Sequence, residues 1–243
     1  MSALEAAILT YHSLDETGSV ISVSPPLFRR QMEALKAAGI PVAPLDQVRE
    51  VPGSVSLTFD DGFCNFLEVA APVLASLGFP ATVFVVSGHC GGFNDWVWQP
   101  LPVPRLPLMG WSQVRQISEA GFDIGGHTVR HPRLTHLTPP QVAGELGDCR
   151  AEIEDHIGKP THSFAYPYGD VSARVREEAG RVYRVCCSTE LDFVPGDPDP
   201  LLLPRIDAYY LRPPWAFDWL CRRRLKPYLG LRRVLRRWRS ALS

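Results

Sequence analysis

Residues 54–62 read SVSLTFDDG, a β-branched apolar run followed directly by two carboxylates and a glycine. The run predicts a buried strand, and Asp60 and Asp61 stand where that strand ends. Successive side chains of an extended chain point to opposite sides, so the two carboxylates can take different roles. One can bind a cation while the other stays free as a general base. An Asp-Asp-Gly turn before a helix would give the same letters, and this stretch alone does not separate the two interpretations.

Apolar runs alternate with helical patterns on both sides of this stretch. The runs predict seven strands, at residues 6–12, 54–59, 81–86, 122–126, 163–166, 183–188 and 201–206. The patterns between them predict five helices, at residues 24–38, 65–77, 112–120, 138–157 and 171–179. Strands that are apolar throughout and alternate with helices form a parallel sheet covered on both faces. This α/β pattern fits a closed or nearly closed barrel better than an open sheet, with reactive groups at the C-terminal ends of the strands.

A second motif, HTVRH at residues 127–131, follows the strand expected at residues 122–126. Imidazoles four residues apart meet on one side of a helical turn and can bind one ion together. Pro132 disfavours helix at His131, so the motif lies on a single turn or in a tight loop. Two solvated loop histidines are the ordinary alternative, but the Asp-Asp motif at another strand end favours a metal site. Two His and one Asp leave coordination positions open, as a catalytic metal requires.

A third stretch, FAYPYG at residues 164–169, again ends an expected strand and carries no signal alone. In combination, the three motifs resemble the polysaccharide deacetylase family, the NodB-homology or family-four carbohydrate esterases, over about residues 5–210. The resemblance implies a distorted (β/α)7 barrel. It also implies a hydrolase that removes N-acetyl groups from amino sugars of a polysaccharide or lipid-linked glycan. Its one divalent metal is usually zinc, although the N/N/O ligand set also accepts cobalt, nickel or manganese.

The resemblance further assigns roles to individual residues. The metal ligands it implies are Asp61, His127 and His131. Asp60 corresponds to the general base of the family. Tyr168, which follows Pro167, corresponds to the aromatic residue whose backbone N–H helps to hold the oxyanion.

Two departures from the family pattern concern catalytic residues. Ala165 stands where members commonly carry an Arg that orients the base, and no histidine follows His162 to serve as the usual C-terminal catalytic histidine. Tyr11-His12, at the end of the first expected strand, is similar instead to a circularly permuted subgroup that includes poly-N-acetylglucosamine deacetylases. We therefore expect His12 to be the general acid, and Arg205 to replace the missing Arg. A rim histidine and a surface salt bridge are the alternative interpretations of these two residues.

Trp96 and Trp98, in a glycine-bearing loop at residues 91–110, are candidates for a substrate rim because aromatic faces suit the C–H surfaces of sugar rings.

Two other functions stay open at this point. A non-catalytic member would keep the barrel and bind glycan, which Ala165 favours and the intact Asp and His residues oppose. A related amidohydrolase would act on a small linear or cyclic amide.

Charge divides the chain into two parts. Nine basic residues and no acidic one lie between Arg222 and Arg239, which leaves 16 basic against 26 acidic residues elsewhere. We expect a deacetylase domain at residues 1–214 and a basic amphipathic tail at residues 215–243. The apolar residues that interrupt the tail at roughly helical spacing are Leu225, Tyr228, Leu229, Leu231, Val234, Leu235 and Trp238. Helices of this kind lie on an anionic membrane surface or dock on a protein partner.

Cysteine usage and the N-terminus predict the compartment. The six cysteines form no CxxC pair, and Cys186 and Cys187 are adjacent, which suits free thiols in a reducing environment. The first residues lack the charged and apolar regions of a signal peptide, and no apolar run of about 18 residues is present. The expected location is the cytoplasm, including the inner membrane face, and no nucleic-acid partner is expected.

Overall fold

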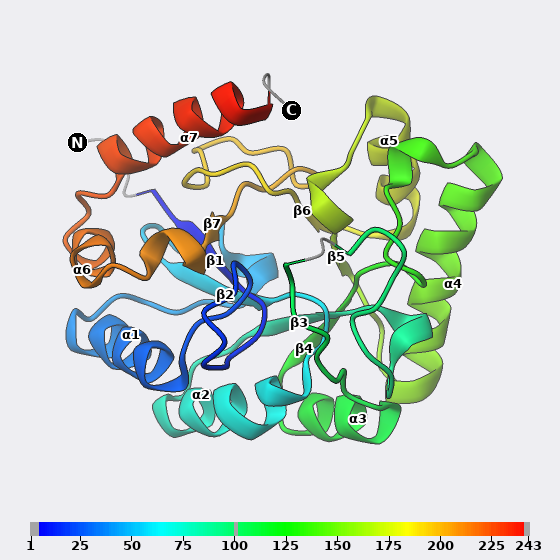
Figure 1. Cartoon of the computed structure of the whole chain (residues 1–243), viewed down its shortest axis with the longest axis horizontal. Helices are drawn as coiled ribbons and strands as arrows, with labels where there is room; N and C mark the ends of the chain where they lie inside the picture. Colours follow the sequence, from blue (N-terminus) through cyan, green and yellow to red (C-terminus); the bar gives the residue numbers. More distant parts are fainter. Residues whose placement is uncertain (1–4, 100–101, 241–243) are drawn as a thin grey trace.

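Seven parallel strands form the centre of the computed structural model, which describes residues 5–99 and 102–240, with side chains as far as residue 236. The strands are β1 (Ala7–Tyr11), β2 (Val55–Phe59), β3 (Thr82–Val85), β4 (Asp123–Gly126), β5 (Ser163–Ala165), β6 (Val185–Cys187) and β7 (Ile206–Asp207). Their order is β6-β5-β4-β3-β2-β1-β7, and β1 lies between β2 and β7, with Leu9 opposite both Leu57 and Ile206. Figure 1 shows this curved sheet with the helices around it.

The two edges of the sheet approach one another through the segment that precedes β7. Leu203 forms a parallel bridge with Cys187, and its N–H donates to the Cys186 carbonyl at 2.9 Å. The Ser188 N–H in turn donates to the Leu203 carbonyl at 2.9 Å. These bonds complete the ring of strands, and the expected distorted (β/α)7 barrel is confirmed.

The last strand differs from the sequence prediction. A strand was expected at residues 201–206, but β7 contains only Ile206 and Asp207. Pro204 has no N–H to donate to a neighbouring strand, and the Arg205 N–H donates to the Glu190 carbonyl at 2.8 Å, outside the ladder. The strand therefore begins only after Arg205.

The helices are α1 (Pro25–Ala37), α2 (Ala71–Leu77), α3 (Trp111–Glu119), α4 (Pro139–Ile157), α5 (Ala173–Val182), α6 (Pro214–Cys221) and α7 (Lys226–Ser240). Proline in the first turn starts several of them, where its missing N–H costs nothing. Gly78 and Gly158, both with positive φ, end α2 and α4. The helix expected at residues 65–77 is divided, since Phe66–Ala70 is a π-helical turn. Pro72 cannot donate to the Glu68 carbonyl, which explains why the regular ladder starts only afterwards.

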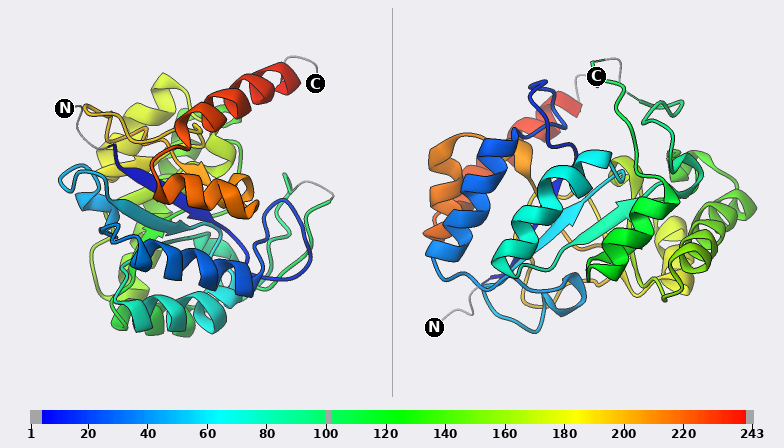
Figure 2. Two further views of the ribbon diagram at one scale, coloured as in Figure 1. Left: turned by 90° about the vertical axis from the view of Figure 1, so that its left-hand side faces the viewer. Right: turned by 90° about the horizontal axis from the view of Figure 1, so that it is seen from below.

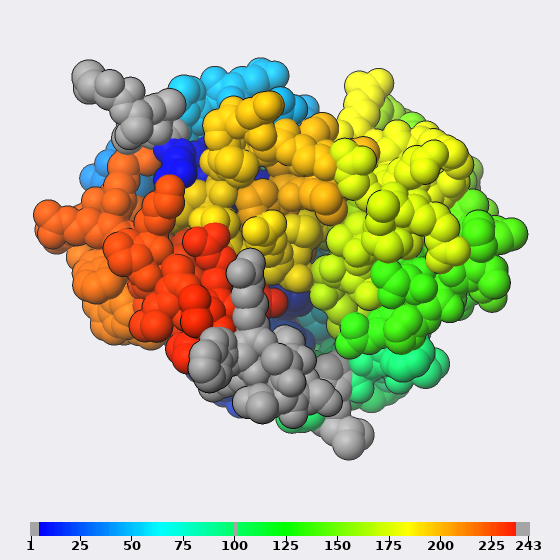
Figure 3. Space-filling view, turned by 90° about the horizontal axis from the view of Figure 1, so that it is seen from above, coloured from blue at the N-terminus to red at the C-terminus, as the bar shows by residue number. Residues whose placement is uncertain are grey.

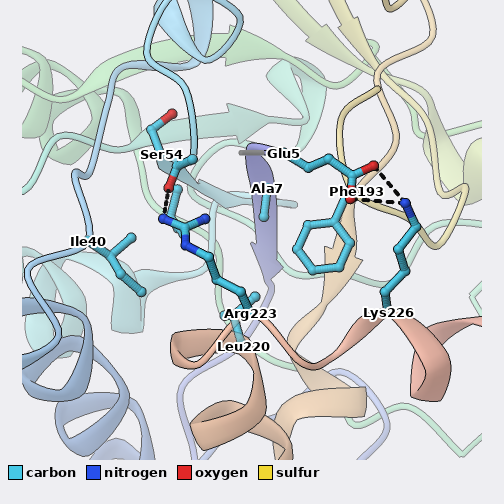
Figure 4. Close-up of a pocket in the computed structure, with 10 residues that line it drawn as sticks. Glu5, Ala7, Ile40, Ser54, Phe193, Leu220, Arg223 and Lys226 are labelled. Atoms are coloured by element: carbon cyan, nitrogen blue, oxygen red, sulfur yellow. Dashed lines mark hydrogen bonds and ion pairs between the residues drawn. The ribbon is translucent and has the colours of Figure 1, made fainter. Parts of the chain in front are cut away.

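Part of the segment expected as a tail packs into the barrel domain. Phe217 and Leu220 of α6, and Leu225 and Leu229 beyond it, are buried in the same apolar cluster as β1 and β2. The link between α6 and α7 contacts the N-terminal end of the barrel, as Figure 4 shows. There the Arg223 guanidinium donates to the Gly53 carbonyl at 3.1 Å, and Lys226 pairs with Glu5 at 2.8 Å.

Residues 5–99 and 102–240 include no helix whose length and apolar character would allow it to cross a bilayer.

Candidate active site

The C-terminal ends of the strands surround a cavity of about 420 Å³. Most of the expected site residues line it, as do several aromatic residues. Those expected from the sequence are His12, Asp60, Asp61, Trp96, His127, His131, Tyr168 and Arg205. They come from loops after β1, β2, β3, β4 and β5 and from the residue before β7, so one cavity collects residues from six segments of the chain. In a parallel barrel this is the end where active sites lie.

Three donor atoms at the bottom of this cavity form a compact triangle. His127 Nε2 and His131 Nε2 are 3.2 Å apart, and they lie 3.4 and 3.5 Å from Asp61 Oδ1. Ligands placed tetrahedrally at about 2.1 Å from one zinc ion are separated by roughly 3.4 Å. The triangle therefore fits a single divalent cation, and all three residues are buried.

The far side of each imidazole is fixed by a hydrogen bond. His127 Nδ1–H donates to the Ala165 carbonyl at 2.7 Å, which leaves Nε2 as the unprotonated nitrogen of the neutral ring. His131 Nδ1 lies 3.0 Å from the Tyr168 hydroxyl, to which it donates in the tautomer with a free Nε2. Burial, reinforced by the neighbouring His127, lowers the pKa of His131 well below its usual value. Both rings thus present lone pairs to the same point, as metal-binding histidines do.

The backbone around the triangle adopts conformations that side chains rarely accept. Five non-glycine residues of the described chain have positive φ, and four of them belong to this site: Asp61 (72°), Thr128 (69°), His131 (56°) and Tyr168 (59°). Such conformations cost about 1–3 kcal/mol each and persist only where the surrounding structure imposes them. Their concentration here indicates that geometry at this site has been kept at the expense of local stability.

Glu145 on α4 holds the histidine loop and was missed by the sequence analysis. Its Oε2 accepts from the N–H groups of Val129 and Arg130 at 2.9 and 3.0 Å, and its Oε1 pairs with the Arg130 guanidinium at 2.7 Å. A signal was present, because Glu145 falls on the buried face of a helix, next to Val142 and Leu146. A carboxylate on such a face needs donors, and the loop supplies them.

Asp60, which lines the same cavity as the triangle, forms a buried ion pair with Arg205. Arg205 Nη1 and Nη2 donate to Asp60 Oδ1 and Oδ2 at 2.7 and 2.8 Å, and Arg205 Nε donates to the Ser188 carbonyl at 3.0 Å. Burial alone would raise the pKa of Asp60, but Arg205, with smaller help from His127 and His12, lowers it to about 2. Arg205 is only 3% exposed, so the surface salt bridge considered as the alternative is wrong. Ala165, where the sequence resemblance leads us to expect an Arg, offers its carbonyl to His127. That Arg205 replaces this Arg functionally stays a prediction.

His12 also approaches Asp60, on the same carboxylate oxygen that accepts from Arg205 Nη2. Its Nε2 is 3.9 Å from Asp60 Oδ2, beyond hydrogen-bond distance, and its side chain is partly exposed to the cavity. Thus the structure brings His12, Asp60 and the three-donor triangle together.

The aromatic candidates separate into two positions. Trp96 is buried and packs against the His131 ring, with ring centroids 4.2 Å apart, so it forms a wall of the cavity and supports a donor. Trp98 is exposed, contacts His136 and is not among the residues that line the cavity, so its place at a substrate rim stays a prediction. Tyr168 lines the cavity, while Pro167 is buried beneath it.

Comparison with known proteins identifies the family. The family model for polysaccharide deacetylase matches residues 48–183, more than half of the chain and a range that contains the whole triangle. The chain belongs to the polysaccharide deacetylase family. His12 and Arg205 lie outside the matched range, so family membership says nothing about either residue. Assignment to the circularly permuted subgroup stays a prediction.

Individual members of the family resemble the chain at modest identity. It is 26% identical to YxkH of Bacillus subtilis over 194 residues, which cover 75% of the chain and 64% of YxkH. It is 32% identical over 126 residues to chitin deacetylase 1 of Cryptococcus neoformans var. grubii, covering 52% of the chain and 23% of that protein. The chain thus spans less than two thirds of the length of these relatives.

Solved structures of similar fold include the Streptococcus pyogenes deacetylase PplD in complex with acetate. It matches with a TM-score of 0.73 at 23% identity, over 85% of this chain and 93% of PplD. IcaB from Ammonifex degensii matches with a TM-score of 0.73 at 22% identity, over 89% of this chain and 97% of IcaB. At these identities the likeness establishes the fold.

Proposed function

We propose that this protein is a metal-dependent hydrolase that removes N-acetyl groups from amino sugars of a polysaccharide or lipid-linked glycan. The observation that carries the proposal is one cavity in which a three-donor metal triangle lies beside a buried, ionised Asp60. Chitin deacetylase 1, among the relatives, supports the substrate class by its name.

The residues that would hold the cation are Asp61, His127 and His131. Two nitrogen donors and one oxygen donor make zinc our first assignment, with cobalt, nickel and manganese as other cations the set accepts. When bound, a divalent cation would polarise the acetyl carbonyl and lower the pKa of a water molecule toward neutrality.

Asp60 would act as the general base. The two hydrogen bonds from Arg205 keep its carboxylate ionised and fix its plane, and one lone pair on each oxygen remains for a proton. The same ion pair makes Asp60 a weak base. Its contribution to the rate would therefore come from its position, and from the lowered pKa of the water molecule that it deprotonates. In this scheme the Tyr168 backbone N–H donates to the oxygen that becomes negative during attack.

His12 would act as the general acid on the nitrogen side. Amide cleavage leaves a sugar amine, which departs well only when it receives a proton. His12 shares the cavity with Asp60, and its exposure to the cavity leaves room for the amine to approach. The products of the reaction are acetate and a free amino sugar.

The test is acetate release by the zinc-loaded protein from N-acetylglucosamine oligosaccharides, compared with small linear and cyclic amides. We expect release from the oligosaccharides, and release that is at least about 100-fold slower from Asp60→Asn prepared in the same way. Preference for the small amides would overturn the substrate class. Absence of release from any acetamide, by protein that retains its metal, would favour the glycan-binding alternative.

A further inference from the structure

One face of α7 is exposed although it is apolar. Leu231, Val234 and Leu235 are 59%, 51% and 44% exposed, which is unusual for aliphatic residues of a soluble surface helix. The opposite face of α7 is already occupied. There Leu229 is buried in the barrel core, Arg233 pairs with Asp192, and the Arg236 guanidinium donates to the Thr189 carbonyl at 3.2 Å.

This arrangement corrects the simple amphipathic tail expected from the sequence. The sequence pattern predicts that Leu225 and Leu229 belong to the apolar side that meets a membrane or partner. Both are instead fully buried against the barrel domain. Apolar residues therefore lie on two faces of α7. The face with Leu229 packs against the barrel, which leaves the face with Leu231, Val234 and Leu235 exposed. Figure 3 shows α7 in red beside the gold segment that precedes β7.

The exposed face continues onto α6. Tyr228 lies one turn before Leu231 on α7, and its ring centroid is 5.0 Å from that of Trp215, which is 4.9 Å from Trp219. The two tryptophans are 45% and 39% exposed. We call the residues Trp215, Trp219, Tyr228, Leu231, Val234 and Leu235 the tail surface. Amphipathic aromatic rings beside exposed aliphatic residues suit the boundary between lipid headgroups and acyl chains.

The positive charge around the tail surface indicates what kind of partner binds there. From Trp219 to the end of the chain there are nine basic residues and no acidic one, in a protein whose remainder is acidic. An acidic body avoids an anionic membrane, so only the tail surface would approach one. A second copy of this chain would bring an identical positive tail against the first, which repels it.

We propose that the tail surface binds an anionic phospholipid bilayer. Exposed aliphatic and aromatic side chains enter the headgroup boundary while the surrounding arginines contact lipid phosphates. Arg236, on the docked face of α7, lines the active-site cavity, so the helix that carries the tail surface borders the cavity. The left view of Figure 2 shows the C-terminal half of α7 on the same side as the loops after β1 and before α3.

The experiment is co-sedimentation of the full chain with vesicles of phosphatidylcholine alone or with phosphatidylglycerol added. We expect binding only to the anionic vesicles and weakening by salt. The triple variant Leu231→Ser, Val234→Ser and Leu235→Ser should lower the binding constant by about tenfold or more, because three apolar groups no longer enter the lipid. Its activity on a water-soluble substrate should be unchanged, which separates this proposal from the enzymatic one.

A charge-matched pair of variants completes the test. Arg232→Gln removes a charge that lies 6.0 Å from the Tyr228 ring of the tail surface, and Arg29→Gln removes one from an exposed position on α1. Only Arg232→Gln should weaken binding. Equal binding of wild type and triple variant, or no binding of wild type to anionic vesicles, would overturn the proposal. A dimer in solution that the triple variant abolishes would overturn it in favour of self-association.

Discussion

The two ends of the barrel each hold an ion pair; the two pairs have nearly the same length, but one is buried and the other is exposed. At the C-terminal end, Arg205 and Asp60 are 2.7 Å apart with side chains 3% and 5% exposed. At the N-terminal end, Lys226 and Glu5 are 2.8 Å apart with side chains 60% and 41% exposed. Breaking a buried pair leaves an uncompensated charge in a poor solvent, whereas an exposed pair exchanges its partner for water. The distance between the two charged groups therefore does not predict how much stability the protein loses when an ion pair is broken.

Backbone conformation separates the two ends in the same way. The positive-φ residues Asp61, Thr128, His131 and Tyr168 cluster at the C-terminal end, whereas Arg223, also with positive φ, contacts the N-terminal end through an exposed side chain. The C-terminal end thus holds strained and charged groups that packing must support. We infer that one end is built for chemistry and the other for attachment of the tail, and the following predictions test that division from the largest expected effect to the smallest.

The double variant His127→Ala/His131→Ala should lose both its metal and all measurable acetate release, because two of three ligands are gone. Metal analysis after dialysis and the acetate assay check this. His136→Ala/His156→Ala is the matched control, since neither histidine lines the cavity, and it should keep metal and activity. Full metal occupancy in the first variant would contradict the ligand assignment. Treatment of wild type with chelator should abolish activity in the same way, and zinc should restore it.

Asp60→Asn should lower turnover by about 10²–10⁴-fold, the usual range for loss of a general base, while metal content stays normal. Asp61→Asn should instead release the metal. The comparison is sharp because the two residues are adjacent and the substitutions identical. Retention of metal by Asp61→Asn together with its loss in Asp60→Asn would mean that the two roles are reversed.

His12→Ala should bind metal normally and lose about 10²–10³-fold in turnover on an acetamide. The loss should be much smaller on an acetyl ester with a good leaving group, since that group departs without a proton. Parallel kinetics on the two substrates measure the difference. An equal loss on both would show that His12 does something other than protonate the amine.

Arg205→Ala should lower the rate through a misplaced Asp60 and destabilise the fold by about 3–5 kcal/mol, the cost of leaving one partner of a buried pair alone. Metal content should change little, because the hydrogen bonds of the Arg205 side chain go to Ser188, Thr58 and Asp60 and to none of the three ligands. Arg205→Lys keeps the positive charge but loses the pair of hydrogen bonds to the two Asp60 oxygens. It should therefore restore the free energy of unfolding more than the rate of acetate release. Wild-type kinetics in both variants would remove Arg205 from the positioning of Asp60.

Lys226→Ala should change neither activity nor metal content, and the free energy of unfolding should fall by at most about 1 kcal/mol, as for exposed pairs. Denaturant unfolding of Lys226→Ala beside Arg205→Ala measures the contrast directly. A loss of stability as large as that of Arg205→Ala would contradict the division between the two ends.

Much of the fold followed from local patterns. Most of the expected strands and helices lie within three residues of those observed, because apolar runs and proline or glycine boundaries act on their own neighbours. The exceptions have local causes. Pro204 shortens the last strand, and Pro72 lies where the segment after Asp61 changes from a π-helical turn to the α-helix α2. The sequence of the loop after β3 does not say which side chains turn inward, so the burial of Trp96 against His131 is seen only in the structure.

The sequence by itself identified Asp60, Asp61, His127 and His131 as candidates, since Asp60 and His127 each stand directly after a strand and a parallel barrel brings those strand ends together. The sequence resemblance offered Arg205 as the partner of Asp60, but only the tertiary structure shows the contact, because Arg205 is 145 residues away and reaches Asp60 when β7 pairs with β1. It also decided that Glu145 supports the histidine loop and which apolar face of α7 is buried. The physical reason is the same throughout: spacing along the chain fixes which side chains share an element, but contacts between elements depend on how their apolar faces pack.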